Sequence, residues 1–145
     1  MSSRSIRSFI KVALLAVLAA GSASCESEPS TSPSAPGIPV TESFIVTLEP
    51  SGQAFYSFSM ARAGTVSLTL ISVTGPSVPG DALFPVGVGI PIGQLCSAGV
   101  DAAISPGSSP QYTVAKELGV YCVRIGDNAR LGASAAFVLN ITHPK

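Results

Sequence analysis

The sequence predicts an all-β protein: an antiparallel β-sandwich of jelly-roll or immunoglobulin-like type, with about seven to eight strands behind a disordered N-terminal tether. Three observations predict this fold. From Thr41 onward, apolar and polar residues alternate with the period of two that half-buried strands show. Turn residues interrupt this alternation about every ten residues. The 14 Gly and 12 Pro among 145 residues also disfavour long helices.

The chain begins with a segment typical of a secretory signal peptide, predicted for residues 1–24. Arg4, Arg7 and Lys11 precede an apolar run over residues 12–20, and small residues follow it. The run is far shorter than the ~20 residues that span a bilayer. The alternative is a buried core helix, but the order of charged, apolar and small residues is that of a targeting segment.

Cys25 follows this segment directly. The stretch Ser22-Ala23-Ser24-Cys25 resembles a bacterial lipobox, whose cysteine is lipidated, although an aliphatic residue usually stands where Ser22 does. The resemblance implies a lipid on Cys25 and a membrane as partner, which places the protein in the cell envelope, in the outer membrane or periplasm. The alternative is cleavage after Ala23 and free secretion.

Residues 25–40 form a predicted Ser/Pro-rich linker ahead of a domain over residues 41–145. The linker has too few apolar residues to fold, and its prolines favour an extended spacer. The expected strands span residues 42–49, 53–61, 64–74, 84–92, 95–105, 111–117, 119–127 and 133–143.

Alternation within these strands assigns their faces. The expected inward residues are Phe44, Val46 and Leu48, then Tyr56, Phe58 and Met60, then Val66, Leu68 and Leu70, then Tyr121, Val123 and Ile125, and finally Phe137, Leu139 and Ile141. Arg124 is expected on the opposite face beside Cys122. Residues 84–92 contain Pro and Gly, which indicates an edge or a bulge. Residues 95–105 show the least regular pattern.

The chain has three cysteines, an odd number for an exported protein. A lipid on Cys25 would leave Cys96 and Cys122 as an even pair, and disulfides persist in oxidising compartments. We therefore expect a Cys96–Cys122 disulfide that stabilises the fold by about 3–4 kcal/mol. The alternative is two buried free thiols. The spacing of these residues is not that of a zinc site.

Two stretches carry a resemblance to a known family. They are Gly52-Gln53-Ala54-Phe55-Tyr56-Ser57-Phe58, with the strand at residues 64–70, and Gly119-Val120-Tyr121-Cys122-Val123-Arg124-Ile125. Together they resemble the bacterial pre-peptidase C-terminal (PPC) domain, and the resemblance covers residues 41–143. It implies a noncatalytic β-sandwich with an adhesion, targeting or ligand-binding role. The Cys96/Cys122 pair departs from the family pattern.

The residues needed for catalysis are sparse, so no enzyme, catalytic residue or cofactor is predicted. A Ser–His–acid triad requires a His, and the single one, His143, is expected to be an exposed tail residue. Gly87, Gly89 and Gly93 have neither the spacing nor the following helix of a dinucleotide loop. We expect them to mark a bulge or bend.

Binding groups are equally few, and the ligand-binding residues are not predicted. Asp81, Asp101 and Asp127 are weak calcium candidates, with solvated turn residues as the default interpretation. Phe55, Tyr56 and Tyr112 could stack on a sugar ring. From Cys25 onward, 5 basic residues face 8 acidic ones, so no nucleic-acid partner is expected.

These observations favour a noncatalytic, exported and lipid-anchored envelope protein with a binding or structural role, whose partner is a protein or a glycan. One alternative is an accessory or inhibitory subunit of a secreted hydrolase, which the PPC resemblance implies. Another is a calcium-dependent adhesion module.

Overall fold

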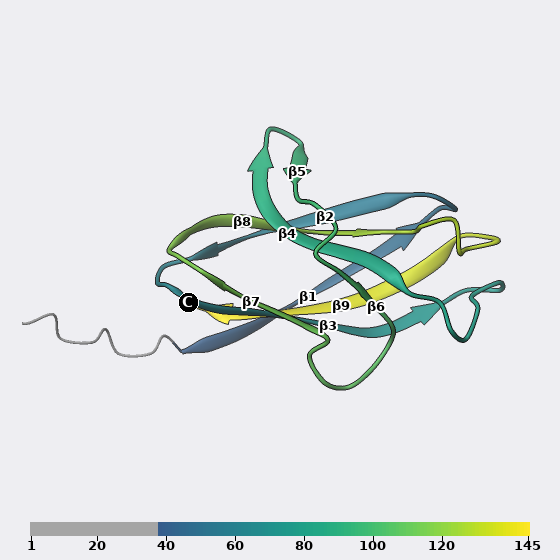
Figure 1. Ribbon diagram of the computed structural model, residues 1–145, viewed down its shortest axis with the longest axis horizontal. Coiled ribbons are helices and arrows are strands. Elements are labelled where there is room, and N and C mark those ends of the chain that lie inside the picture. The colour runs from purple at the N-terminus through teal and green to yellow at the C-terminus, as the bar shows by residue number, and fades with distance from the viewer. Residues whose placement is uncertain (1–37) are drawn as a thin grey trace, which may run out of the picture. The chain divides into compact units, whose positions relative to one another are not determined.

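The computed structural model describes residues 38–145, so the predicted signal peptide, Cys25 and most of the predicted linker lie outside it. The described chain is all-β, with two antiparallel sheets packed face to face (Figure 1). Its strands are β1 (Pro39–Leu48), β2 (Gln53–Met60), β3 (Gly64–Thr74), β4 (Phe84–Ile92), β5 (Leu95–Ser97), β6 (Ala102–Ile104), β7 (Tyr112–Lys116), β8 (Gly119–Gly126) and β9 (Ala135–Pro144).

The strands divide between two sheets. The β1 sheet has the order β1-β9-β3-β7, and the β2 sheet has the order β2-β8-β4-β5, with β6 also paired to β4. The predicted sandwich is therefore confirmed. Strand β1 begins at Pro39, two residues before the expected domain start, because Pro39 and Val40 pair with Pro144 and His143 of β9.

The core lies between the sheets, where alternation predicted it. In β3 and β9, the inward residues Val66, Leu68, Leu70, Phe137, Leu139 and Ile141 are fully buried. Phe84 of β4 meets Phe137 edge to face, with ring centroids 4.8 Å apart, which joins the two sheets. Each such buried side chain contributes about 1.5–3 kcal/mol relative to exposure.

The expected strand over residues 95–105 is two short strands, and this accounts for nine strands in the described chain. Both pair with the same edge of β4, β5 with Ile90–Ile92 and β6 with Phe84–Val86. Between them, residues 98–101 belong to no strand. The hairpin of β4 and β5 bends away from the β2 sheet and stands above it (Figure 1). Within residues 38–145, no helix is long and apolar enough to cross a membrane.

Candidate functional site: a groove beside a disulfide-bonded hairpin

The outer face of the β2 sheet carries a groove, and two glycines make it possible. Gly87 and Gly89 of β4 lie on this face, opposite Arg124 and Cys122 of β8. A Cβ atom on Gly89 would lie 2.0 Å from the Ser97 carbonyl oxygen, and one on Gly87 would lie 2.1 Å from the carbonyl oxygen of residue 99. The chain after β5 can therefore pass directly over β4 only because these side chains are absent.

The disulfide fixes this path. Cys96 of β5 is bonded to Cys122 of β8, with the two Cα atoms 5.8 Å apart, as the sequence predicted. Cys122 is fully buried on the outer face, because the returning chain covers it. Arg124 adds a second link, since its Nη2 donates to the carbonyl oxygen of Gly99 at 3.0 Å. The hairpin is thus held to β8 at two points.

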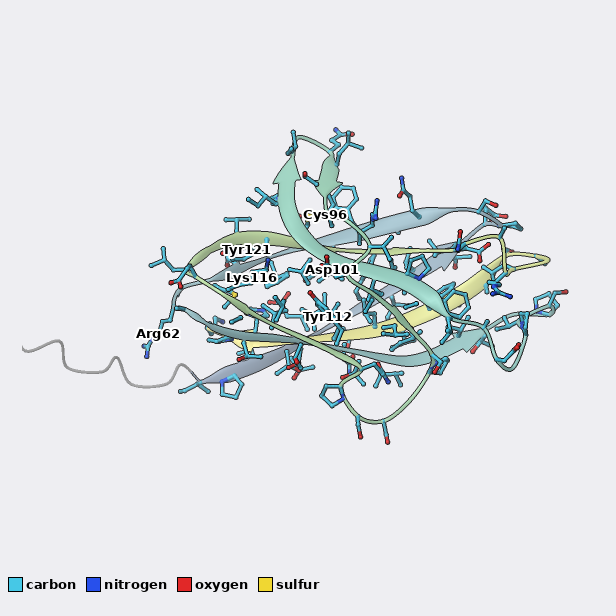
Figure 2. All side chains as sticks on the ribbon, in the orientation of Figure 1. Arg62, Cys96, Asp101, Tyr112, Lys116 and Tyr121 are labelled. Carbon is cyan, nitrogen blue, oxygen red and sulfur yellow. A yellow bond between two sulfur atoms is a disulfide. The ribbon has the colours of Figure 1, made fainter. Side chains whose placement is uncertain are left out.

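Between β5 and β6, where no strand pairs with that edge of β4, Asp101 makes hydrogen bonds to the β4 backbone. Its Oδ2 accepts a hydrogen bond from the Val88 backbone N–H at 2.8 Å, and its own N–H donates to the Val86 carbonyl at 2.9 Å. Asp101 also lies near Tyr112 of the β1 sheet (Figure 2). Burial raises the pKa of Tyr112 above its ordinary value of 10.0, and the negative charge of Asp101 raises it further.

The resulting groove lies between the hairpin and β2. It has a volume of about 350 Å³ and is lined by Gln53, Ala54, Phe55, Leu95, Cys96 and Arg124. Phe55 and Arg124 are directly opposite each other in the β2–β8 pairing, so they share this face. Arg124 has five N–H donors, of which the contact with Gly99 uses one. The groove therefore offers an aromatic and aliphatic wall beside a cationic hydrogen-bond donor.

A smaller hollow of about 130 Å³ continues from the groove, sharing Gln53 and Arg124 with it and ending at Asp127. The lining of the groove itself contains no carboxylate or imidazole, and Cys96 is oxidised in the disulfide. Such a lining suits contact with a ligand and supplies no general acid or base.

His143 is buried rather than exposed, so the prediction of an exposed tail residue is wrong. Its side chain is 1% exposed, because β9 continues to Pro144 and places residue 143 on the inner face. Its Nε2 lies 3.2 Å from Glu42 Oε1, and its Nδ1 lies 3.0 Å from the Pro144 carbonyl oxygen. Its ring also packs on Phe58, with centroids 4.7 Å apart. Both ring nitrogens therefore have partners inside the protein.

Glu42 joins this cluster to the other sheet. Its Oε2 accepts a hydrogen bond from the Tyr56 hydroxyl of β2 at 2.7 Å. This hydrogen bond raises the pKa of Tyr56 above its ordinary value of 10.0, and desolvation and the charge of Glu42 act in the same direction. The contacts of Tyr56, Glu42 and His143 join the edge strands β1 and β2, which belong to different sheets.

The other predicted site residues do not come together. Among residues 38–145, no three His, Cys, Asp or Glu side chains lie close enough to hold a metal ion. Asp81 is exposed in a turn, as the default interpretation held. For Asp127 that interpretation is wrong, since its side chain is buried and holds backbone N–H groups.

The three aromatic residues likewise form no common platform. Phe55 and Tyr56 are neighbours in β2 and point to opposite faces, while Tyr112 lies in the β1 sheet beside Asp101. Gly87 and Gly89 mark a close approach of two chain segments, and of the two predicted features β4 shows the bend (Figure 1) and no bulge in its pairing with β8. The register shift lies in β3, between Leu70 and Ser72. The excess of Gly in residues 84–92 was the one sequence signal for the groove.

Neither a comparison with models of known protein families nor one with curated proteins gave a match for this chain. The resemblance to the PPC domain therefore stays a prediction.

Proposed function

We propose that this chain is a noncatalytic, exported protein of the cell envelope that is anchored in a membrane by a lipid on Cys25. The groove beside the hairpin is its contact site for a protein or glycan partner. The observation that carries the proposal is the construction of that groove: two glycines of β4 let the returning chain pass over that strand, and a disulfide and Arg124 link that chain to β8.

Two further observations support it. The Cys96–Cys122 disulfide suits an exported protein, because such bonds persist in oxidising compartments. The imidazole of His143 is enclosed and contacts Glu42 and the Pro144 carbonyl, so it is occupied in holding the edge strands together. A noncatalytic role agrees with both the enclosed imidazole and the lining of the groove.

The anchor is tested by the intact mass of the native protein from a membrane fraction. The expected mass corresponds to a chain that begins at Cys25 and carries acyl groups, and a Cys25→Ser variant should move to the soluble fraction. A soluble native protein that begins at Ser24 would contradict the anchor.

The groove is tested by placing a photo-crosslinking amino acid at Phe55 in intact cells. The matched control position is Ile45, which is 70% exposed on β1 of the other sheet. We expect a discrete protein or glycan adduct from position 55 and none from position 45. Equal crosslinking at both positions, or none at either, would contradict a partner in the groove.

A further inference from the structure

The tip of the β4–β5 hairpin exposes a cluster of aliphatic side chains. Ile90, Ile92 and Leu95 are 61%, 62% and 68% exposed. Ile92 is directly opposite Leu95 in the pairing, and Ile90 is two residues from Ile92, so all three lie on one face of the hairpin. Single exposed aliphatic residues are ordinary in proteins, whereas several gathered on one protruding element mark a contact surface.

The hairpin itself is uncharged, since from Ala82 to Val100 the chain contains no charged residue. The single charge among the outward side chains of β2 and β8 is Arg124. Asp101, the next residue along the chain, accepts a hydrogen bond from the Val88 backbone N–H. One positive and one negative charge thus flank the hairpin, and a tip without charge of its own enters a headgroup layer without the cost of desolvating an ion.

The proposed anchor lies within reach of this surface. Cys25 is 13 residues before Ile38, where the described chain begins, and that length spans at most about 45 Å. A compact domain of this size has a radius of gyration of about 13 Å. The maximum reach of the linker exceeds this radius, so the domain has room to turn relative to the bilayer that holds the lipid.

We propose that the β4–β5 hairpin is a second membrane contact, in which Ile90, Ile92 and Leu95 enter the interfacial region of the anchoring bilayer. This inference rests on the proposed function, because the lipid on Cys25 keeps the domain at the membrane. A protruding aliphatic tip can insert at the boundary between lipid headgroups and acyl chains, because the fluid lipids need to provide neither a complementary pocket nor many hydrogen bonds. The disulfide contributes by fixing the hairpin upright before it meets the membrane.

The test uses the chain from Cys25 to Lys145, produced without acylation and with the disulfide formed. The thiol of Cys25 is coupled to a maleimide-headgroup lipid in phosphatidylcholine vesicles, which replaces the biological anchor. The protein has no Trp, so Leu95→Trp places a single fluorescent reporter on the hairpin. Ile45→Trp, at a site 70% exposed on β1, is the matched control.

We expect Trp fluorescence at position 95 to shift to shorter wavelength on coupling and to be quenched by brominated acyl chains. At position 45 neither change should occur. Adding Ile90→Ser and Ile92→Ser should weaken the quenching at position 95. An unchanged spectrum at position 95, or a shift that requires phosphatidylglycerol and disappears in salt, would overturn aliphatic insertion. Because the coupling is chemical, these outcomes are independent of whether Cys25 is acylated in cells.

Discussion

At the scale of single residues, Asp127 organises one end of the sandwich. Its carboxylate accepts hydrogen bonds from the backbone N–H groups of Ser51 and Arg130, both at 2.8 Å, and from Leu131 at 3.2 Å. Ser51 and Ala129 have φ angles of 60° and 55°, a region that costs energy for residues other than glycine. One buried side chain thus holds two strained turns that lie far apart in sequence.

The same contacts predict a pH dependence. Burial raises the pKa of Asp127, but the backbone hydrogen bonds from Ser51, Arg130 and Leu131 outweigh it, so the pKa lies below its ordinary value of 3.8. The stabilisation is therefore fully present above that ordinary value and is lost as pH falls through the folded-state pKa.

We expect Asp127→Asn to lower the free energy of unfolding by about 2 kcal/mol at neutral pH, because the amide replaces a charged acceptor. The gap between variant and native protein should narrow in strong acid, as urea unfolding at pH 7 and near pH 2 will show. Asp81→Asn, in an exposed turn, is the control and should change the value by less than about 0.5 kcal/mol. A gap of equal size at both pH values would contradict this account.

At the scale of elements, the path of the β4–β5 hairpin depends on the close approach of two backbones. The Ser97 carbonyl carbon would lie 2.5 Å from a Cβ on Gly89, in addition to its oxygen at 2.0 Å. Neither atom belongs to a flexible side chain, so an added methyl group would displace the returning chain. The disulfide and the groove lie on that same stretch and would be displaced with it.

Gly89→Ala should therefore lower the free energy of unfolding by about 3 kcal/mol, at the upper end of typical overpacking costs. It should also make the disulfide easier to reduce, which thiol labelling under a fixed concentration of reductant will measure. Gly80→Ala is the matched control, because a Cβ there meets nothing within 4 Å. If the two variants behave alike, the hairpin does not depend on this close approach.

At the scale of the whole molecule, each open edge of the sandwich brings together a carboxylate and a tyrosine from opposite sheets. Glu42 of the β1 sheet accepts from Tyr56 of the β2 sheet. At the opposite edge, the charge of Asp101, which follows β5 of the β2 sheet, raises the pKa of Tyr112 of the β1 sheet, together with burial. Lys116 of β7 adds a contact between the sheets, with its Nζ 5.7 Å from the centroid of the Tyr121 ring (Figure 2). The sheets are thus held together by polar contacts as well as by the core.

We expect Tyr56→Phe, which removes the hydrogen bond to Glu42, to lower the free energy of unfolding by about 1 kcal/mol, and Tyr112→Phe, which removes a hydroxyl near Asp101, to lower it by less. Their effects should add in the double variant, since the two pairs share no partner. The pKa values of both tyrosines are raised above 10.0, so this stabilisation is present below pH 10 and is lost as pH rises through the folded-state pKa values. Urea unfolding from pH 8 to pH 11 will test this pH dependence. If the double variant loses no more free energy of unfolding than one single variant, the two edges do not contribute independently.

Alternation in the sequence was sufficient to predict the sandwich and the inward faces of its strands. Val66, Leu68, Phe137 and Leu139 are buried as expected, because the side-chain period of a strand is a local property of the backbone. The disulfide was predicted from the cysteine count, because a lipid on Cys25 leaves Cys96 and Cys122 as an even pair in an oxidising compartment. None of these inferences required knowledge of which strands are neighbours.

The groove and the polar contacts were decided by tertiary structure. Glu42 and His143 are 101 positions apart, and their contact exists only because β1 pairs with β9 along ten residues. The alternation of Phe137, Leu139 and Ile141 continues to His143 and indicates an inward ring, but only the pairing of β9 with β1 as far as Pro144 keeps that position inside the sandwich. The groove likewise arises where the chain crosses over Gly87 and Gly89. The sequence of each segment at this crossing does not identify the other segment that it contacts. The sequence by itself therefore determined which side chains point inward, whereas the pairing of distant strands determined which polar groups meet.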